Sequence, residues 1–320
     1  MKVTVIAQAR LHFGFTNLTP GLGNVYGSVG VGLDRPFTRV TAEPAEDFSV
    51  HGPRAEQVGG YADRLAGHYG VRWRARLTVE EIVDRHSGLG SGTQTALATA
   101  AALLRLHGLG HDIREAAGAM DRGLRSGVGI AAFESGGFIL DGGHPDLERP
   151  EVITPSSVLV RHDFPEDWRF VLFLPSLGPG LSGKSEKAVF RDLGDTRAVT
   201  DAICRTVLLN MLPALVDRDV EAFGRALTEV DTQTGRFFQE AQGGTYREKL
   251  AADAVGALLA AGAYGVGQSS WGPCLYGLVD GRTEDDVVRA ARKFLDGHGL
   301  QGKVVQAGPN NRGAEILVQE

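Results

Sequence analysis

A run of glycines and hydroxyl side chains is the segment of this sequence best suited to chemistry. Residues 87–96 read Ser-Gly-Leu-Gly-Ser-Gly-Thr-Gln-Thr-Ala, between a strand-like alternation over 71–79 and an alanine-rich stretch typical of a helix. Such a loop offers free N–H groups, the positive end of a helix dipole, and hydroxyls for phosphate oxygens or Mg²⁺. The sequence therefore predicts an anion-binding loop. Its substrate-binding residues are Gly88, Leu89, Gly90, Ser91, Gly92 and Thr93, and its metal ligands are Ser91 and Thr93.

The loop matches neither of two common nucleotide-binding motifs. No lysine follows its last glycine, as in a Walker A loop, and the later acidic residue of a Rossmann turn is missing. Glycine is nevertheless concentrated: 24 of the 44 lie in the segments 14–32, 88–92, 123–143, 178–183 and 262–277. Clustered glycine makes turns or lets the backbone approach a ligand closely. Five clusters, several beside Ser, Thr or Arg, favour a phosphate-handling cleft.

Composition and charge exclude several classes of protein. Among 320 residues, 33 Lys and Arg against 39 Asp and Glu leave a net charge of -6, which argues against a nucleic-acid partner. Two cysteines are too few for a disulfide framework and lack metal-ligand spacing. The apolar run 96–104 is too short to span a bilayer, and the N-terminus lacks a signal-peptide core. We expect a soluble cytoplasmic protein without a membrane partner.

The elements that must position the loop alternate between strands and helices. Strand patterns begin at residue 3 and recur at 71–79, 170–174, 274–279 and 314–318. Helical patterns cover 94–107, 113–122, 197–217, 219–230, 246–262 and 284–296. Three prolines over 145–155 suggest a boundary. The fold class is therefore α+β with two lobes, 1–150 carrying the phosphate-binding loop and 151–320 following it.

The loop resembles the phosphate loop of the GHMP superfamily, which includes galactokinase, homoserine kinase and mevalonate kinase. Residues 9–15 and 262–273 are similar to the first and third motifs of that superfamily, in the expected order. The resemblance implies a GHMP-kinase-like fold. Its N-lobe would resemble domain 2 of ribosomal protein S5, its C-lobe would be ferredoxin-like, and the active cleft would lie between the lobes.

The similarity is closer to one branch, the β-ribofuranosylaminobenzene 5′-phosphate synthase (β-RFAP synthase) family. It covers the segments 10–12, 27–33, 125–134, 136–144, 180–183 and 267–273. The resemblance implies a decarboxylating phosphoribosyltransferase of tetrahydromethanopterin biosynthesis. It would condense p-aminobenzoate with 5-phosphoribosyl 1-pyrophosphate and release CO₂ and pyrophosphate. Mg²⁺ as cofactor and a homodimer are further expectations from this family.

The alternative is an ATP-dependent GHMP small-molecule kinase. Such kinases carry an Asp three residues after the Ser of a Ser-Gly-x-Asp segment, whereas Gly129 occupies that place here, after Ser126. The side chain of glycine is a hydrogen atom, which cannot accept or orient the proton of a substrate hydroxyl. The kinase loop also continues Ser-Ser-Ala, and this chain has Ser91-Gly92-Thr93. Both departures disfavour phosphoryl transfer and leave phosphate binding intact.

Several side chains outside the loop are candidates for the reaction. Arg10 and Arg125 have the planar fork that suits a carboxylate or phosphate, or equally an internal salt bridge. His12 lies on the same strand face as Arg10 and either contacts substrate or makes a structural hydrogen bond. The further catalytic candidates are Glu134, Asp141, Gln268 and Ser269. Each of the two acids could be a metal ligand, a stabiliser of the sugar cation, or a structural cap. The further substrate-binding candidates are Ser126, Lys184, Ser270 and Trp271, with Lys184 on the 5′-phosphate or solvated and Trp271 against the aromatic ring or in the core.

Overall fold

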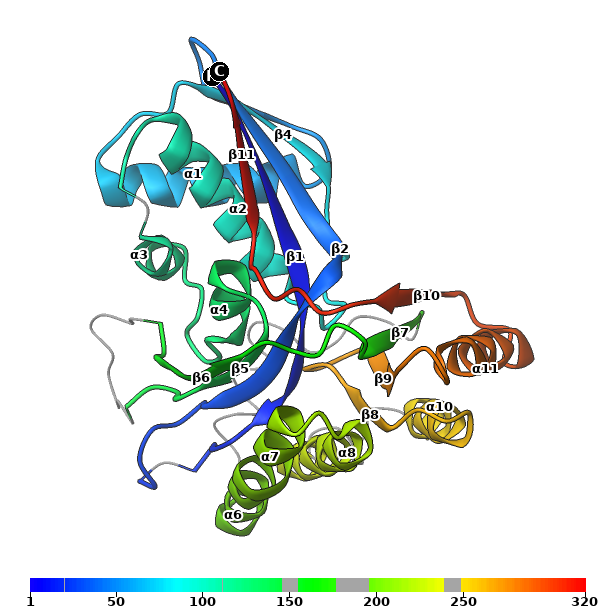
Figure 1. Cartoon of the computed structure of the whole chain (residues 1–320). Helices are drawn as coiled ribbons and strands as arrows, with labels where there is room; N and C mark the ends of the chain where they lie inside the picture. Colours follow the sequence, from blue (N-terminus) through cyan, green and yellow to red (C-terminus); the bar gives the residue numbers. More distant parts are fainter. Residues whose placement is uncertain (20, 111, 146–154, 177–195, 239–248) are drawn as a thin grey trace.

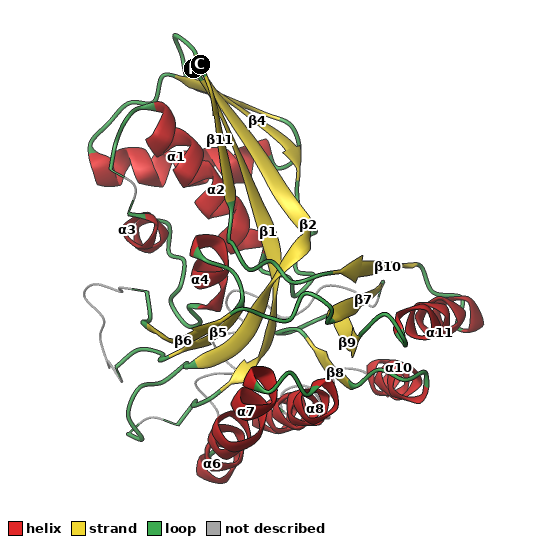
Figure 2. Cartoon of the chain, in the orientation of Figure 1, coloured by secondary structure: helices red, strands yellow, loops and turns green. Residues whose placement is uncertain are grey.

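Two sheets, each covered by helices, make up the molecule (Figures 1 and 2). This computed structural model describes residues 1–19, 21–110, 112–145, 155–176, 196–238 and 249–320. Figure 1 shows the two chain ends meeting at one end of the larger sheet. The α+β fold class and its two-lobed arrangement are confirmed.

The first sheet has seven strands, in the order β11-β1-β2-β4-β3, with β5 paired to β2 and β6 paired to β5. Its strands are β1 (Lys2–Phe15), β2 (Ser28–Pro44), β3 (Ser49–His51), β4 (Ala75–Glu81), β5 (Phe138–Asp141), β6 (Val158–His162) and β11 (Glu315–Gln319). All its pairs are antiparallel except β3 with β4. Alternate residues of β1 from Val3 to Ala9 are buried, as expected for a strand with one covered face.

Four helices cover that face (Figure 2). They are α1 (Ala55–Tyr69), α2 (Ser91–Leu106), α3 (Ile113–Ala119) and α4 (Val128–Glu134). Helix α2 is the central one and is buried along most of its length, because alanine lets it lie close to β1 and β2. Its N-terminus follows the glycine loop directly, with Gly90 as the cap residue.

The second sheet has the strand order β10-β7-β9-β8. Its strands are β7 (Arg169–Pro175), β8 (Gly265–Gln268), β9 (Leu275–Val279) and β10 (Gly302–Ala307). Its helices are α6 (Arg197–Thr206), η1 (Val207–Met211), α7 (Leu212–Val216), α8 (Val220–Phe237), α10 (Lys249–Ala260) and α11 (Glu284–Gly297). Counted along the chain, the order is 4-1-3-2 with helices between the strands, which confirms the ferredoxin-like lobe.

One apolar core joins the two lobes. The side chain of Phe13, at the far end of β1, has its ring centroid 5.7 Å from that of Tyr276 on β9 and 6.5 Å from that of Phe223 on α8. All three side chains are buried. The strand that carries Arg10 and His12 is therefore fixed by both lobes.

One helical stretch, 197–216, has the length and apolar composition of a membrane span. It is formed by α6, η1 and α7, and it packs against α8 (Figure 1). Its side chains Ile203, Val207 and Met211 belong to the main core, whereas Leu208, Leu209 and Val216 are exposed.

One expected strand is displaced in the structure. The strand expected over 71–79 is β4 at 75–81, because Trp73 turns inward and donates its indole N–H to the Ala62 carbonyl at 2.8 Å. The division at residue 150 stays a prediction. The pairing shows that β6 and β11, both from beyond that residue, complete the first sheet.

The contact of α8 with β8 supplies a stability test. A Cβ on Gly224 would overlap the Tyr264 carbonyl oxygen and stand 2.8 Å from the Gly265 nitrogen. We expect Gly224→Ala to lower the free energy of unfolding by about 1–3 kcal/mol through overpacking. Gly256→Ala is the control, since nothing lies within 4 Å of that position on α10 and alanine favours helix. Urea unfolding of both variants measures the difference, and equal stabilities would show that α8 does not sit this close to β8.

Candidate active site

The carbonyl oxygen of Gly88 is the point where three distant segments meet. Arg10 donates to it through Nη1 at 2.5 Å, and Ser269 donates to it through Oγ at 2.7 Å. The same Ser269 oxygen accepts the backbone N–H of His12 at 3.0 Å. The structure thus brings together Arg10, His12, the loop and Ser269, as the sequence predicts for a common site.

Backbone geometry on both sides of this point aims the side chains. The pairing of β1 with β2 shifts register between Gln8 and Arg10 and again between His12 and Gly14. Such irregularities re-aim side chains and are frequent beside active sites. Gly88 and Gly90 have φ values of 82° and 78°, in the left-handed region that favours glycine. The loop can therefore turn tightly under the Arg10 side chain, whose Cζ lies 3.3 Å from the Cβ position of Gly90.

Arg10 is a half-buried cation without an acidic partner among the described residues. Burial lowers the pKa of its guanidinium to about 10, so it remains charged at neutral pH. Its side-chain hydrogen bond goes to a carbonyl, and none of the ion pairs between described residues includes it. The internal salt bridge considered from the sequence does not occur in this part of the chain.

His12 is neutral at physiological pH. Burial, and to a smaller extent the neighbouring charge of Arg10, together lower the pKa of its imidazole to about 3. The side chain is 3% exposed, and its Nε2 has no hydrogen-bond partner in the described ranges. Unpaired buried nitrogens are costly, so this atom is suited to a hydrogen bond with a bound molecule.

The first turn of α2 offers amide donors beside the loop. Thr93 and Gln94 donate their N–H groups to the Gly90 carbonyl at 3.0 and 3.1 Å. The N–H groups of Ser91 and Gly92 have no acceptor within the described part of the chain. Ser91 is 8% exposed, whereas the Thr93 side chain packs beside Gly129. The helix dipole and the two free amides form an anion cradle.

Asp141 supports the neighbouring turn through hydrogen bonds to protein groups. Its carboxylate accepts the N–H of Gly127 at 3.0 Å, that of Gly143 at 2.9 Å, and the Ser28 hydroxyl. Ser126 lies 2.7 Å from the same Ser28 hydroxyl, oxygen to oxygen. Burial raises the pKa of Asp141, and these hydrogen bonds oppose that shift. Asp141 therefore fixes the turn that carries Ser126 and the half-buried Arg125.

Glu134 has a structural partner away from the loop. It ends α4 and accepts a two-pronged hydrogen bond from Arg114 of α3, with distances of 2.8 to 3.0 Å. Within the described residues, its carboxylate bonds neither to the glycine loop nor to Arg10. Of the two acids singled out from the sequence, one thus holds a turn and the other joins two helices.

The last glycine loop carries the remaining candidates. Gln268 donates its N–H to Asp231 at 2.7 Å and its side-chain amide to the Ser270 carbonyl at 3.3 Å. Ser270 is exposed, whereas Trp271 is 8% exposed and packs on Phe238 with centroids 4.5 Å apart. The Trp271 ring therefore belongs to the core behind the site. Lys184 lies outside the described residues.

Sequence analysis missed two residues at the loop, Tyr61 and Arg122. Arg122 Nη1 lies 3.3 Å from the Cβ position of Gly92, and its guanidinium stacks on the Tyr61 ring. No motif marks either residue, because both reach the loop through tertiary packing alone. The one signal in the sequence was Gly92, because a residue without a side chain leaves room for a neighbouring side chain.

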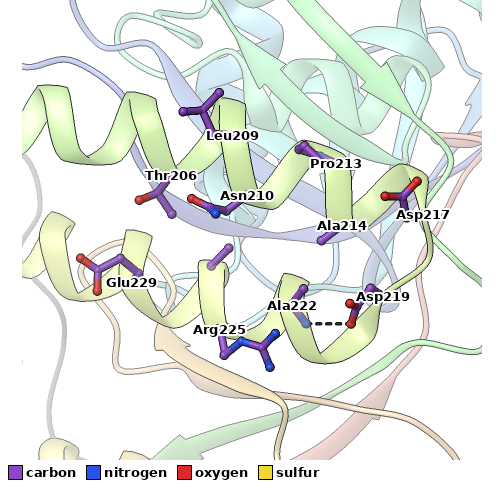
Figure 3. A pocket seen from close by; sticks show the side chains of 11 residues that line it. Thr206, Leu209, Asn210, Pro213, Ala214, Asp217, Asp219, Ala222, Arg225 and Glu229 are labelled. Atoms are coloured by element: carbon purple, nitrogen blue, oxygen red, sulfur yellow. Dashed lines mark hydrogen bonds between the residues drawn. The ribbon is translucent and has the colours of Figure 1, made fainter.

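A separate groove of about 430 Å³ lies between η1–α7 and α8 (Figure 3). The side chains of Asn210, Asp217, Arg225 and Glu229 line it. None of the loop residues borders it. It carries no part of the candidate site.

Comparisons with known proteins match both lobes of the chain to GHMP kinase domains. The model for the GHMP kinases N terminal domain matches residues 57–137, and that for GHMP kinases C terminal matches 211–297. A beta-ribofuranosylphenol 5'-phosphate synthase of Methanothermobacter thermautotrophicus is 31% identical, covering 99% of each chain. That of Archaeoglobus fulgidus is 33% identical over 97% of this chain and 98% of its own. A homoserine kinase structure from Cytophaga hutchinsonii has a TM-score of 0.70 at 17% identity, covering 99% and 97%, which shows the fold alone.

Replacing Ser269 tests the meeting point directly. Ser269→Ala removes the acceptor of the His12 N–H and one donor to Gly88, so we expect a loss of about 1–3 kcal/mol in unfolding free energy. The control is Ser270→Ala, because that side chain is exposed and its loss should change stability by less than about 0.5 kcal/mol. Thermal and urea unfolding give the comparison. Equal losses in the two variants would contradict the bridging role of Ser269.

The neutrality of His12 predicts a pH dependence of stability. The unfolded imidazole protonates below its ordinary pKa of 6.5, whereas the folded one resists protonation down to about 3. The contribution of His12 to the free energy of unfolding is fully present above pH 6.5. It falls by about 1.4 kcal/mol per pH unit below that value. Between pH 7 and pH 5 the protein should lose about 2 kcal/mol more than its His12→Gln variant. Urea unfolding at the two pH values measures this difference, and parallel losses would show that folded His12 protonates normally.

Proposed function

Because the chain belongs to the beta-ribofuranosylphenol 5'-phosphate synthase family, within the GHMP superfamily, we propose that it makes an aryl riboside 5′-phosphate. The donor is 5-phosphoribosyl 1-pyrophosphate and the acceptor a benzoate with an electron-donating group para to its carboxylate. CO₂ and pyrophosphate leave. The single observation that carries the proposal is Arg10, a charged, half-buried guanidinium without an acidic partner among the described residues, lying over the glycine loop.

The chemistry requires little covalent help from the protein. The bond from ribose C1 to the diphosphate oxygen breaks with its electron pair on the diphosphate, and C1 becomes an oxocarbenium-like centre. The ring carbon bearing the carboxylate bonds to C1, and the ring–carboxylate bond then breaks and restores aromaticity. Charges balance without an oxidant or an added proton. The enzyme must hold the leaving diphosphate and exclude water from the cation.

The described side chains match these tasks. The amides of Ser91 and Gly92 and the guanidinium of Arg10 would bind the negative charge of the substrate. Neutral His12 would offer its unpartnered Nε2 as one hydrogen-bond position. The buried Trp271 and Phe238 rings give the site an apolar, water-excluding support. No residue is required as a covalent nucleophile.

Mg²⁺ fits this site only as a companion of the diphosphate. No group of three His, Cys, Asp or Glu side chains in the described ranges forms a metal cage. Mg²⁺ is commonly held by substrate phosphates with few protein ligands. In our proposal the hydroxyls of Ser91 and Thr93 are its protein ligands, and the ion would stabilise charge on the departing diphosphate. A cytoplasmic homodimer completes the proposal, as expected from the resemblance.

The identity of the para substituent has two candidates. The sequence resemblance favours p-aminobenzoate. The name of the relatives, beta-ribofuranosylphenol 5'-phosphate synthase, favours p-hydroxybenzoate, because the ring of such a product carries a hydroxyl. Amino and hydroxyl groups both enrich the carbon para to them. Direct comparison of the two benzoates therefore decides the substrate.

The assay uses each benzoate labelled at its carboxyl carbon, with phosphoribosyl pyrophosphate and Mg²⁺. We expect labelled CO₂ and pyrophosphate in equal amounts, and no label release when ribose 5-phosphate replaces phosphoribosyl pyrophosphate, because that sugar lacks the leaving group. Folded protein that releases no label from either benzoate would sink the proposal. ADP formation from ATP with a hydroxylated acceptor would favour a kinase instead.

A further inference from the structure

Arg122 stands against the first turn of the helix that follows the phosphate loop. Its Nη1 lies 3.3 Å from the Cβ position of Gly92, the second residue of α2. A Cβ at that position would make a tight contact, and the guanidinium would have to shift by a few tenths of an ångström. The glycine therefore leaves room for a guanidinium at the end of the loop, where a Walker A loop would keep its lysine.

The position of Arg122 is fixed from two sides. Its Nε donates to the Met120 carbonyl at 3.2 Å, and its Cζ lies 5.3 Å from the centroid of the Tyr61 ring. The Tyr61 hydroxyl in turn donates to the Gly92 carbonyl at 3.4 Å and accepts from Gln57 at 2.8 Å. Tyr61 thus holds both the arginine and the helix turn in one arrangement. The Nη1 and Nη2 groups of Arg122 have no acceptor within the described part of the chain.

This placement is electrostatically unfavourable without a bound anion. The N-terminus of a helix carries positive partial charge, so an adjacent cation is repelled there. The first turn of α2 contains no acidic residue, and no described carboxylate pairs with Arg122. Arg10 adds a second guanidinium over Gly90, two residues away along the loop. A bound polyanion would remove the repulsion among all three positive groups.

We propose that Arg122 is a substrate-binding residue, and that it and Arg10 clamp the diphosphate of the donor from opposite sides of Gly90–Gly92. This proposal rests on the proposed function for the identity of the donor. Each guanidinium offers paired N–H groups in one plane, which match two oxygens of a phosphate. The amides of Ser91 and Gly92 lie between the two arginines along the chain. Each phosphate of the diphosphate would then face one guanidinium.

The test measures binding of inorganic pyrophosphate, with Mg²⁺, to the whole protein by calorimetry. We expect Arg122→Gln to weaken the affinity about 10- to 100-fold, the effect of losing a charge-assisted hydrogen bond. Arg122→Lys keeps the positive charge but lacks the planar pair of N–H groups. Its affinity for pyrophosphate should lie between those of Arg122→Gln and the native protein. Circular dichroism and thermal unfolding establish that each variant is folded. If Arg122→Gln is unstable, the Arg122→Lys result decides.

Arg64→Gln is the matched control. Arg64 donates to the same Met120 carbonyl at 3.3 Å and pairs with Asp121 at 2.7 Å, and it is not among the neighbours of the Gly92 Cβ position. The affinity of Arg64→Gln for pyrophosphate should stay within about two-fold of that of the native protein, as for an exposed ion pair.

A second ligand, ribose 5-phosphate, reports on binding of the 5′-phosphate of the donor. Its affinity should be unchanged in Arg122→Gln.

The outcomes separate this proposal from the proposed function. Native pyrophosphate affinity in Arg122→Gln would overturn the clamp, even if the protein releases labelled CO₂. Equal losses for pyrophosphate and ribose 5-phosphate would overturn the assignment to the diphosphate. An Arg122-dependent pyrophosphate affinity in a protein that releases no CO₂ would support the clamp and reject the proposed reaction.

Discussion

The carbonyl oxygen of Gly88 is the acceptor on which the geometry of the site depends. It receives Arg10 from the N-terminal strand and Ser269 from a loop of the other lobe. A left-handed backbone at Gly88 gives the loop this course, and a Cβ there would overlap the Ser269 carbonyl. One small residue thus sets the position of the cation, the loop and the second lobe together. The site is a product of both lobes and cannot form in either one alone.

The positive charge of the site follows from the lack of a carboxylate beside Arg10 among the described residues. Burying a guanidinium costs free energy that a carboxylate normally offsets, and the described residues give Arg10 a carbonyl instead. The neutral state of His12 has the same origin, because burial and the charge of Arg10 both oppose its protonation. The free protein therefore holds uncompensated positive charge beside a helix N-terminus. A bound anion would stabilise the folded state in proportion to its concentration over its dissociation constant.

The sequence reveals the local parts of this site and little of their tertiary partners. Glycine motifs mark the loop because close backbone approach has few other solutions, and Arg10 and His12 follow from strand periodicity. Arg122 could not be identified, since its neighbour Gly92 is distant in the chain and no spacing rule links them. Asp141 looked equally suited to catalysis, and only the amides and hydroxyl around it show that it holds a turn. Trp73 shifted the expected strand because its indole found an acceptor on another element.

The two departures from the kinase pattern occupy one place in the structure. A Cβ at Gly129, where such kinases carry an aspartate, would stand 3.3 Å from Cγ2 of Thr93, which replaces the alanine of the kinase loop. That distance is tighter than most carbon contacts, so a side chain at 129 would require Thr93 to move by a few tenths of an ångström. The pair is also tied through Gln94, whose side-chain amide donates to the Gly129 carbonyl at 2.8 Å. The loop is packed for holding phosphate groups without a carboxylate beside them, which suits departure of a diphosphate better than activation of a hydroxyl.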